Sequence, residues 1–270
     1  MKKTSRLVVN NLSKTFSLGF LSKRHVDAVK GISFEVKPGE IVSLVGESGS
    51  GKSTTAKMLL RLVPPTSGEI IFEGRNIWVD IKKKEEIVTF RRELHAVFQD
   101  PFASYNSFYP VERPLWQAIN LLPKKLSKNE ALERIKEALF KVGLDPKDIL
   151  GKYPHQVSGG QKQRIMIARC WLLRPKFIIA DEPTSMIDAS SRGSIIKLLQ
   201  NLREEQGTSI MFITHDLGLA YYVSDRIFVM KDGELVEQGE PDDVVLKPKH
   251  EYTKTLVGSI PKLYKKAEDL

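Results

Sequence analysis

A glycine-rich loop between an apolar strand and a helix constrains the fold of this chain more than any other feature. Residues 46–53 read GESGSGKS and directly follow the apolar run at 40–45. Glycine adopts positive φ without steric cost, which lets the backbone approach a ligand closely. N–H groups at a helix N-terminus attract anions, because the helix dipole adds to them. The pattern therefore predicts a phosphate-binding loop in a mostly parallel α/β sheet covered by helices.

The loop assigns roles to its own residues. We expect Lys52 to reach the β- and γ-phosphates, the Ser53 hydroxyl to ligate Mg²⁺, and Thr54 to reach the α-phosphate. Contact with the nucleotide is expected for Gly46, Glu47, Ser48, Gly49, Ser50, Gly51, Lys52, Ser53 and Thr54. The loop alone does not separate kinases, GTPases and ATPases.

Four polar side chains follow predicted strands further along the chain. Asp181 and Glu182 end an apolar strand, where a carboxylate is costly unless a partner such as Mg²⁺ is near. Glu182 is then the candidate base that orients the attacking water. Gln99 follows a strand and is expected to touch both Mg²⁺ and this water. His215 follows another strand and is expected to hydrogen-bond the γ-phosphate.

A second anion cradle lies between the loop and the acids. Ser158, Gly159, Gly160 and Gln161 open a helix and supply a hydroxyl, flexible backbone and a helix N-terminus. The ATP held by Lys52 already has such a cradle. The second one therefore suggests that ATP is held between two subunits; the alternative is an ordinary helix capped by serine.

In this order, the motifs resemble those of the ABC (ATP-binding cassette) ATPases over most of residues 7–240. The resemblance implies a RecA-like P-loop NTPase: a mostly parallel sheet, an N-terminal antiparallel β subdomain and a helical subdomain inserted at about 99–163. Helical periodicity within the insert predicts a helix over 129–142 capped by Ser127. Residues 17–27 are expected to form a basic loop.

The resemblance also implies two further contacts with the nucleotide. Asp188 ends the sequence SMID, where the family more often has SALD, and is expected to touch the opposite site of a dimer. Phe16 stands where the family places an aromatic that stacks on adenine. A core phenylalanine is the alternative for Phe16, and Phe20 or His25 could stack instead.

A narrower resemblance points to importers of oligopeptides and dipeptides. It is carried by FQDPFAS at 98–104 and by HEYTKTL at 250–256. It implies a nucleotide-binding domain over residues 1–246 and a C-terminal extension over 247–270. Several members bind an iron–sulfur centre through cysteines in this tail, which has none here, so we expect no such cluster. Related importers carry oligosaccharides or nickel, and the substrate stays open.

Composition limits the partners and the compartment. The net charge of +9 comes from scattered lysines and arginines, which favours a solvated surface over nucleic acid or anionic lipid. No apolar run approaches the ~20 residues that span a membrane. One cysteine, Cys170, fits a reducing cytosol and is expected to pack on a helix.

The importer interpretation implies a peripheral subunit at the cytoplasmic face of the membrane. Its expected partners are a second ABC ATPase subunit, identical or different, two integral membrane permease subunits and, indirectly, an extracytoplasmic substrate-binding protein. Aromatic residues in 101–116 are expected to form part of a groove for a short permease helix. They are Phe102, Tyr105, Phe108, Tyr109 and Trp116. The alternative is that one or two of them belong to the core of the small lobe.

Two other classes of protein compete with this interpretation. A soluble ABC protein of translation or DNA repair usually carries two cassettes in one chain or a long coiled-coil insert, and neither is present in the sequence. A small-molecule P-loop kinase does not explain the run 158–161.

Overall fold

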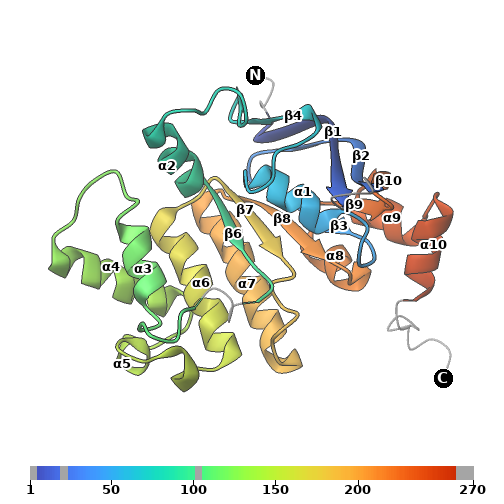
Figure 1. Cartoon of the computed structure of the whole chain (residues 1–270). Helices are drawn as coiled ribbons and strands as arrows, with labels where there is room; N and C mark the ends of the chain where they lie inside the picture. The colour runs from blue at the N-terminus through green and yellow to red at the C-terminus, as the bar shows by residue number, and fades with distance from the viewer. Residues whose placement is uncertain (1–4, 19–23, 101–104, 260–270) are drawn as a thin grey trace, which may run out of the picture.

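Two β-sheets and the helices around them make up the protein (Figure 1). The computed structural model describes residues 5–18, 24–100 and 105–259. The first sheet has the order β2-β1-β4-β5 and is antiparallel. Its strands are β1 (Leu7–Leu18), β2 (Arg24–Val36), β4 (Ser67–Phe72) and β5 (Arg75–Asn76).

The second sheet has the order β10-β9-β3-β8-β7-β6. Its strands are β3 (Ile41–Val45), β6 (Leu94–Val97), β7 (Phe177–Asp181), β8 (Ser209–Thr214), β9 (Arg226–Lys231) and β10 (Glu234–Gly239). Only β10 runs antiparallel to its neighbour. Every residue of β3 and β8 is buried, as expected for strands covered on both faces.

The parallel register brings the carboxyl ends of four strands to one edge of this sheet. Val45 pairs with Thr214, Ala180 with Val97, and Asp181 with Ile213. The segments that follow these strands contain the phosphate loop, Gln99, Glu182 and His215. Ligands of open α/β sheets bind at this edge.

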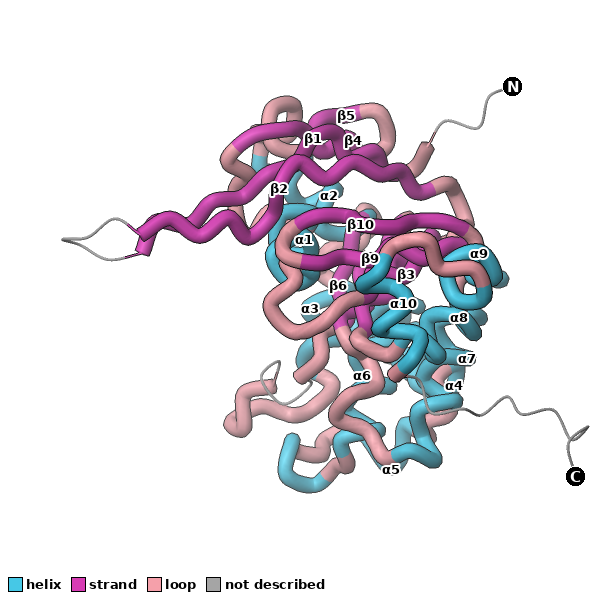
Figure 2. Tube along the Cα trace, turned by 90° about the vertical axis from the view of Figure 1, so that its right-hand side faces the viewer, coloured by secondary structure: helices cyan, strands magenta, loops and turns pink. Residues whose placement is uncertain are grey.

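Helices lie around both sheets and are named here in the order of the chain. The first helices along the chain are α1 (Lys52–Leu59), α2 (Lys84–Glu93), α3 (Arg113–Ile119), α4 (Lys128–Lys141) and α5 (Pro146–Ile149). The short 3-10 helix η1 (Pro154–Gln156) precedes α6 (Gly159–Leu173), α7 (Ala189–Gln206) and α8 (Leu217–Val223). The last two are α9 (Pro241–Leu246) and α10 (Glu251–Gly258), which lie beside β9 and β10 (Figure 2).

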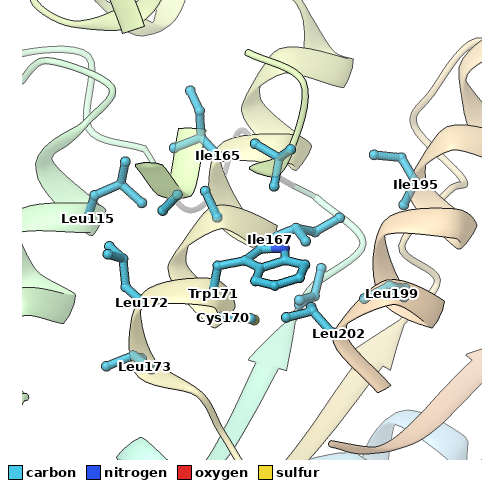
Figure 3. Close-up of a cluster of buried hydrophobic side chains, with 14 of the residues drawn as sticks. Leu115, Ile165, Ile167, Cys170, Trp171, Leu172, Leu173, Ile195, Leu199 and Leu202 are labelled. Carbon is cyan, nitrogen blue, oxygen red and sulfur yellow. The ribbon is translucent and has the colours of Figure 1, made fainter. Parts of the chain in front are cut away.

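Buried apolar side chains of the helices and sheets form three clusters. One cluster lies between α3, α4, α6 and α7, with Trp171 and Cys170 near its centre (Figure 3). A second joins α1 and the antiparallel sheet to the parallel sheet. The third packs α8, α9 and α10 against β3 and β9. Among the described residues, no helix combines the length and apolar character needed to cross a bilayer.

Several predictions of secondary structure are confirmed and one is wrong. Ser127 caps α4 by accepting from the Glu130 N–H, and Cys170 is buried on α6, where burial raises the pKa of its thiol to about 12. The basic loop predicted over 17–27 is wrong at both ends, because β1 continues to Leu18 and β2 begins at Arg24. Pairing between the two strands, such as Ser17 with His25, extends them into the basic segment. The domain boundaries near 99, 163 and 246 stay predictions.

Candidate functional site

The phosphate loop joins β3 to α1 and is closely packed from behind. Gly46 has φ of 155°, and a Cβ there would lie 2.1 Å from the Met230 carbonyl oxygen. Gly51 has φ of 105°, and its Cβ would lie 2.4 Å from the Ala28 carbonyl oxygen. These two positions accept only glycine, because β9 and β2 approach the loop backbone so closely. The loop is thus fixed by the sheets on either side.

Lys52 is buried inside the loop that it belongs to. Its ammonium donates to the carbonyls of Gly46 at 2.6 Å and Glu47 at 2.7 Å, and to Ser50 Oγ at 3.3 Å. Burial lowers the pKa of Lys52, and the charges of Glu182 and Asp181 oppose this shift. A cation held between the loop and two acids is well placed to meet phosphate oxygens.

The two acids after β7 have different surroundings. Burial raises the pKa of Asp181, Glu182 raises it further, and Lys52 opposes the rise. Glu182 has φ of 44°, which is rare outside glycine, and its N–H donates to the Ile213 carbonyl at 2.9 Å. Uncommon backbone conformations of this kind gather at functional sites. The turn directs the side chain of Glu182 to the next strand end.

Glu182 and His215 are in direct contact. His215 Nδ1 lies 3.1 Å from Glu182 Oε1, and the His215 side chain is 66% exposed. The ring therefore reaches into solvent while one nitrogen is held by the carboxylate. This leaves the other ring nitrogen free to meet a ligand.

A cleft of about 450 Å³ collects nine of the predicted site residues. It is lined by Ala28, Ser48, Gly49, Gly51, Lys52, Ser53, Thr54, Gln99, Glu182 and His215. Of these, only Ala28 was not predicted; it lies on β2 and no motif marks it. A larger cleft, about 750 Å³, lies between α4, α6 and α7 and contains none of the predicted residues.

The second cradle lies outside this cleft. Ser158 is the N-cap of α6: its hydroxyl accepts from the Gln161 N–H, and the Gln161 side chain accepts from the Ser158 N–H. Within one chain, the serine-capped helix thus accounts for Ser158 and Gln161. Ser158 is exposed, and neither it nor Gly159 or Gly160 lines the cleft around Lys52. A role in nucleotide binding therefore requires a second chain.

Six other predicted residues also lie apart from the cleft lining: Gly46, Glu47, Ser50, Phe16, Asp181 and Asp188. Asp188 is exposed at the start of α7, and Asp181 lies at the end of β7 behind Glu182. Phe16 is on β1, 36% exposed, with the Lys14 ammonium 5.1 Å from its ring centre. His25 is exposed on β2, and Phe20 lies outside the described residues. The aromatic that meets adenine stays a prediction.

The aromatic residues of 101–116 divide between the core and the surface. Tyr105 is partly buried, as the core alternative predicts for one or two of them. Its ring packs against the cluster of α3, α4, α6 and α7, and its hydroxyl donates to the Lys162 carbonyl at 3.1 Å. Burial raises the pKa of this phenol. Trp116 is also partly buried there, whereas Phe108 is 86% and Tyr109 43% exposed. Phe102 lies outside the described residues.

The fold and this edge of the sheet define a P-loop ATPase, and a comparison with known families gives its class. The family model for ABC transporters matches residues 29–185, more than half of the chain. The chain belongs to the ABC transporter ATPases. The resemblance of its motifs to this family is thereby confirmed.

Curated relatives and solved structures agree with this assignment. The chain is 42% identical over 236 residues to the oligopeptide transport ATP-binding protein OppF of Bacillus subtilis, covering 87% of this chain and 77% of that protein. It is 43% identical to OppF of Streptococcus mutans, with 94% and 80% covered. The dimeric cassette MJ0796 bound to ADP and Pi matches with a TM-score of 0.76 and 31% identity, covering 87% and 98%. Part of the cbiONQ complex, cbiO1 from Clostridium perfringens, matches at 0.74 and 32%, covering 90% and 91%.

Proposed function

We propose that this chain is the ATP-hydrolysing subunit of an importer for oligopeptides or dipeptides. The relatives named as peptide transport ATP-binding proteins support the substrate class, since they align over most of both chains. The hydrolytic role rests on one observation above the others. Glu182 and His215, in contact at 3.1 Å, share a cleft with Lys52 and the phosphate loop.

Each group in the cleft has a role in hydrolysis. Lys52 and the N–H groups of the loop hold the β- and γ-phosphates and stabilise the charge that develops during transfer. Glu182 orients the attacking water and accepts its proton. His215, held by Glu182 through Nδ1, contacts the γ-phosphate with its other ring nitrogen. Gln99, which lines the cleft, helps to orient the same water.

The residues present fit a Mg²⁺ ion bound together with ATP. Asp181 is a carboxylate whose burial raises its pKa, and a nearby cation offsets the cost of keeping it charged. Ser53, Asp181 and Gln99 would hold the ion through the oxygen ligands that Mg²⁺ prefers. When bound, the ion neutralises charge on the β- and γ-phosphates. No iron–sulfur cluster is proposed, because the chain has a single cysteine.

We infer that the working unit is a pair of cassettes. Ser158 to Gln161 of one subunit then face the nucleotide held by Lys52 of the other, and Asp188 touches the opposite site. The exposure of Ser158 and Asp188 supports this arrangement, as does the dimeric form of the similar cassette MJ0796. The second subunit is another copy of this chain or a related ATPase.

Docking to two permease subunits at the cytoplasmic face of the membrane completes the proposal. A groove of about 210 Å³ is lined by Tyr105, Asn106, Tyr109, Pro110, Arg113, Pro114 and Gln117. The Arg113 guanidinium lies 3.3 Å from the ring centre of Tyr109, so one wall is both aromatic and cationic. Such a wall suits a short permease helix that carries apolar and acidic residues. A substrate-binding protein takes part only through the permease, and no nucleic acid is involved.

Uptake in cells tests the proposal. Cells that lack this chain should lose uptake of a labelled peptide and regain it with the parent gene but not with Lys52→Ala. Labelled oligosaccharide and nickel serve as parallel substrates. Restored uptake of either one, with no effect on peptides, would assign the related importer class instead. An effect on none of the three would leave only the ATPase assignment.

A further inference from the structure

The C-terminal helix α10 touches the phosphate loop through one side chain. The Tyr252 hydroxyl accepts a hydrogen bond from the Glu47 N–H at 2.9 Å. Glu47 is the second residue of the loop, whereas α10 lies far beyond residues 29–185 that match the family model. Tyr252 is buried, and its ring packs in the cluster that contains Val45 and Val229. The segment after residues 29–185 is thus in direct contact with the phosphate loop.

Three groups hold Tyr252 in place. The Glu237 carboxylate on β10 accepts from the N–H groups of Lys249 and His250 at 2.9 and 3.0 Å. His250 Nδ1 in turn accepts from the Tyr252 N–H at 3.1 Å, which caps α10. The Lys231 ammonium lies 4.9 Å from the centre of the Tyr252 ring. The phenol is therefore fixed to the β9–β10 hairpin before it reaches the loop.

The same hairpin supports the loop at a second point. The Gly233 N–H at the tip of the hairpin donates to the Ser50 carbonyl at 3.0 Å. Ser48 and Gly49 line the cleft, whereas Gly46 and Glu47 do not. The peptide group between Gly46 and Glu47 is held at both of its polar atoms. Tyr252, outside the cleft, accepts from its N–H, and Lys52, in the cleft lining, donates to its carbonyl.

We propose that Tyr252 is a positioning residue that keeps the phosphate loop in its nucleotide-binding conformation, so that α10 sets the affinity for ATP. A backbone N–H that loses its partner in a part-buried site favours other conformations of the loop. The apparent affinity falls with the fraction of molecules whose loop is competent. Glu182 and His215 do not depend on this contact, so the chemical step is unaffected. The proposal rests on the proposed function of the cleft as an ATP site.

Tyr252→Phe removes the hydroxyl and keeps the ring. We expect the KM for ATP and the Kd for ADP to rise by about three- to tenfold, which corresponds to one hydrogen bond, with kcat within about twofold. Amide exchange at Glu47 should become faster. Tyr221→Phe is the matched control, because its hydroxyl bonds Asp242 at 2.8 Å away from the loop and should change neither constant.

A second variant guards against loss of the fold. Glu237→Gln weakens the support of α10 without touching the phenol, and should raise both constants in the same direction. Unchanged KM, Kd and Glu47 exchange in Tyr252→Phe would overturn the proposal. So would a fall in kcat and melting temperature with KM unchanged, which would make Tyr252 purely structural. A parent chain without affinity for ATP would instead refute the proposed function, while exchange at Glu47 still reports the contact.

Discussion

Replacing Glu182 with glutamine separates nucleotide binding from hydrolysis. The backbone of Glu182 is held by its N–H on the Ile213 carbonyl, and its own carbonyl accepts from the Ser185 hydroxyl at 3.0 Å. Glutamine has the same size, so neither bond nor the contact with His215 needs to change. Only the negative charge and the proton acceptor are lost. The phosphate loop and Lys52 therefore stay as they are.

The size of the effect follows from what is removed. A positioned general base contributes about 10²–10⁴ in rate, or about 3–5 kcal/mol of barrier. Loss of the Glu182 charge also removes repulsion toward the phosphates, so the affinity for ATP should stay equal or rise. We expect kcat of Glu182→Gln to fall by at least about 10² with Kd for ATP within about threefold.

Phosphate release and equilibrium binding of a fluorescent ATP analogue measure these two constants. Glu204→Gln, the same change at an exposed position on α7, is the control and should match the parent. A fall in kcat of less than about tenfold in Glu182→Gln would refute its role as base. A rise in Kd as large as the fall in kcat would place Glu182 in binding instead.

Three further changes test other parts of the account. Lys52→Ala should raise the Kd for ATP by at least about 10² and abolish turnover, because the phosphate charge loses its buried cation; titration with equal affinity would contradict this. The folded chain holds the Asp181 proton more tightly than the unfolded chain, so stability falls as pH rises above the ordinary value of 3.8. Asp181→Asn should therefore raise the melting temperature more at pH 7.5 than at pH 4.5 and weaken Mg²⁺-dependent ATP binding; an equal gain at both pH values would contradict the burial argument. The double change Phe108→Glu and Tyr109→Glu should leave hydrolysis within about twofold and abolish co-purification with the permease. Tyr222→Glu, on another surface, is the control and should keep co-purification; retained co-purification in the double variant would refute docking at this groove.

The sequence predicted the part of the fold that depends on local patterns. Apolar runs followed by polar residues predict β3, β7 and β8. The phosphate-loop pattern at 46–53 predicts the helix that follows it. The register of these strands, which brings Gln99, Glu182 and His215 to one cleft, required the resemblance to a family. Parallel pairing joins segments far apart in sequence, so no local signal encodes it.

The features that were missed depend on contacts between distant segments. The length of β1 and β2 arises from their mutual pairing, although the basic run at 23–25 favours a loop over residues 17–27. The sequence does not separate Tyr105, which packs against the cluster of α3, α4, α6 and α7, from the exposed Phe108. Tyr252 belongs to the run at 250–256, which resembles the tail of peptide importers but indicates no contact with the loop. Its hydrogen bond to Glu47 spans most of the chain, and only the structure reveals it.

The shared site between two cassettes is tested most directly by the association state of Glu182→Gln. Sedimentation velocity with ATP, with ADP and without nucleotide measures it, for the chain alone and mixed with the second ATPase subunit of its transporter. We predict that Glu182→Gln forms a dimer with ATP only. The double variant with Ser158→Arg should form none, because the bulk and charge of arginine enter the opposite site. A Glu182→Gln chain that binds ATP yet stays monomeric, both alone and mixed with the second subunit, would contradict a shared site. So would a Ser158→Arg chain that still dimerises with ATP.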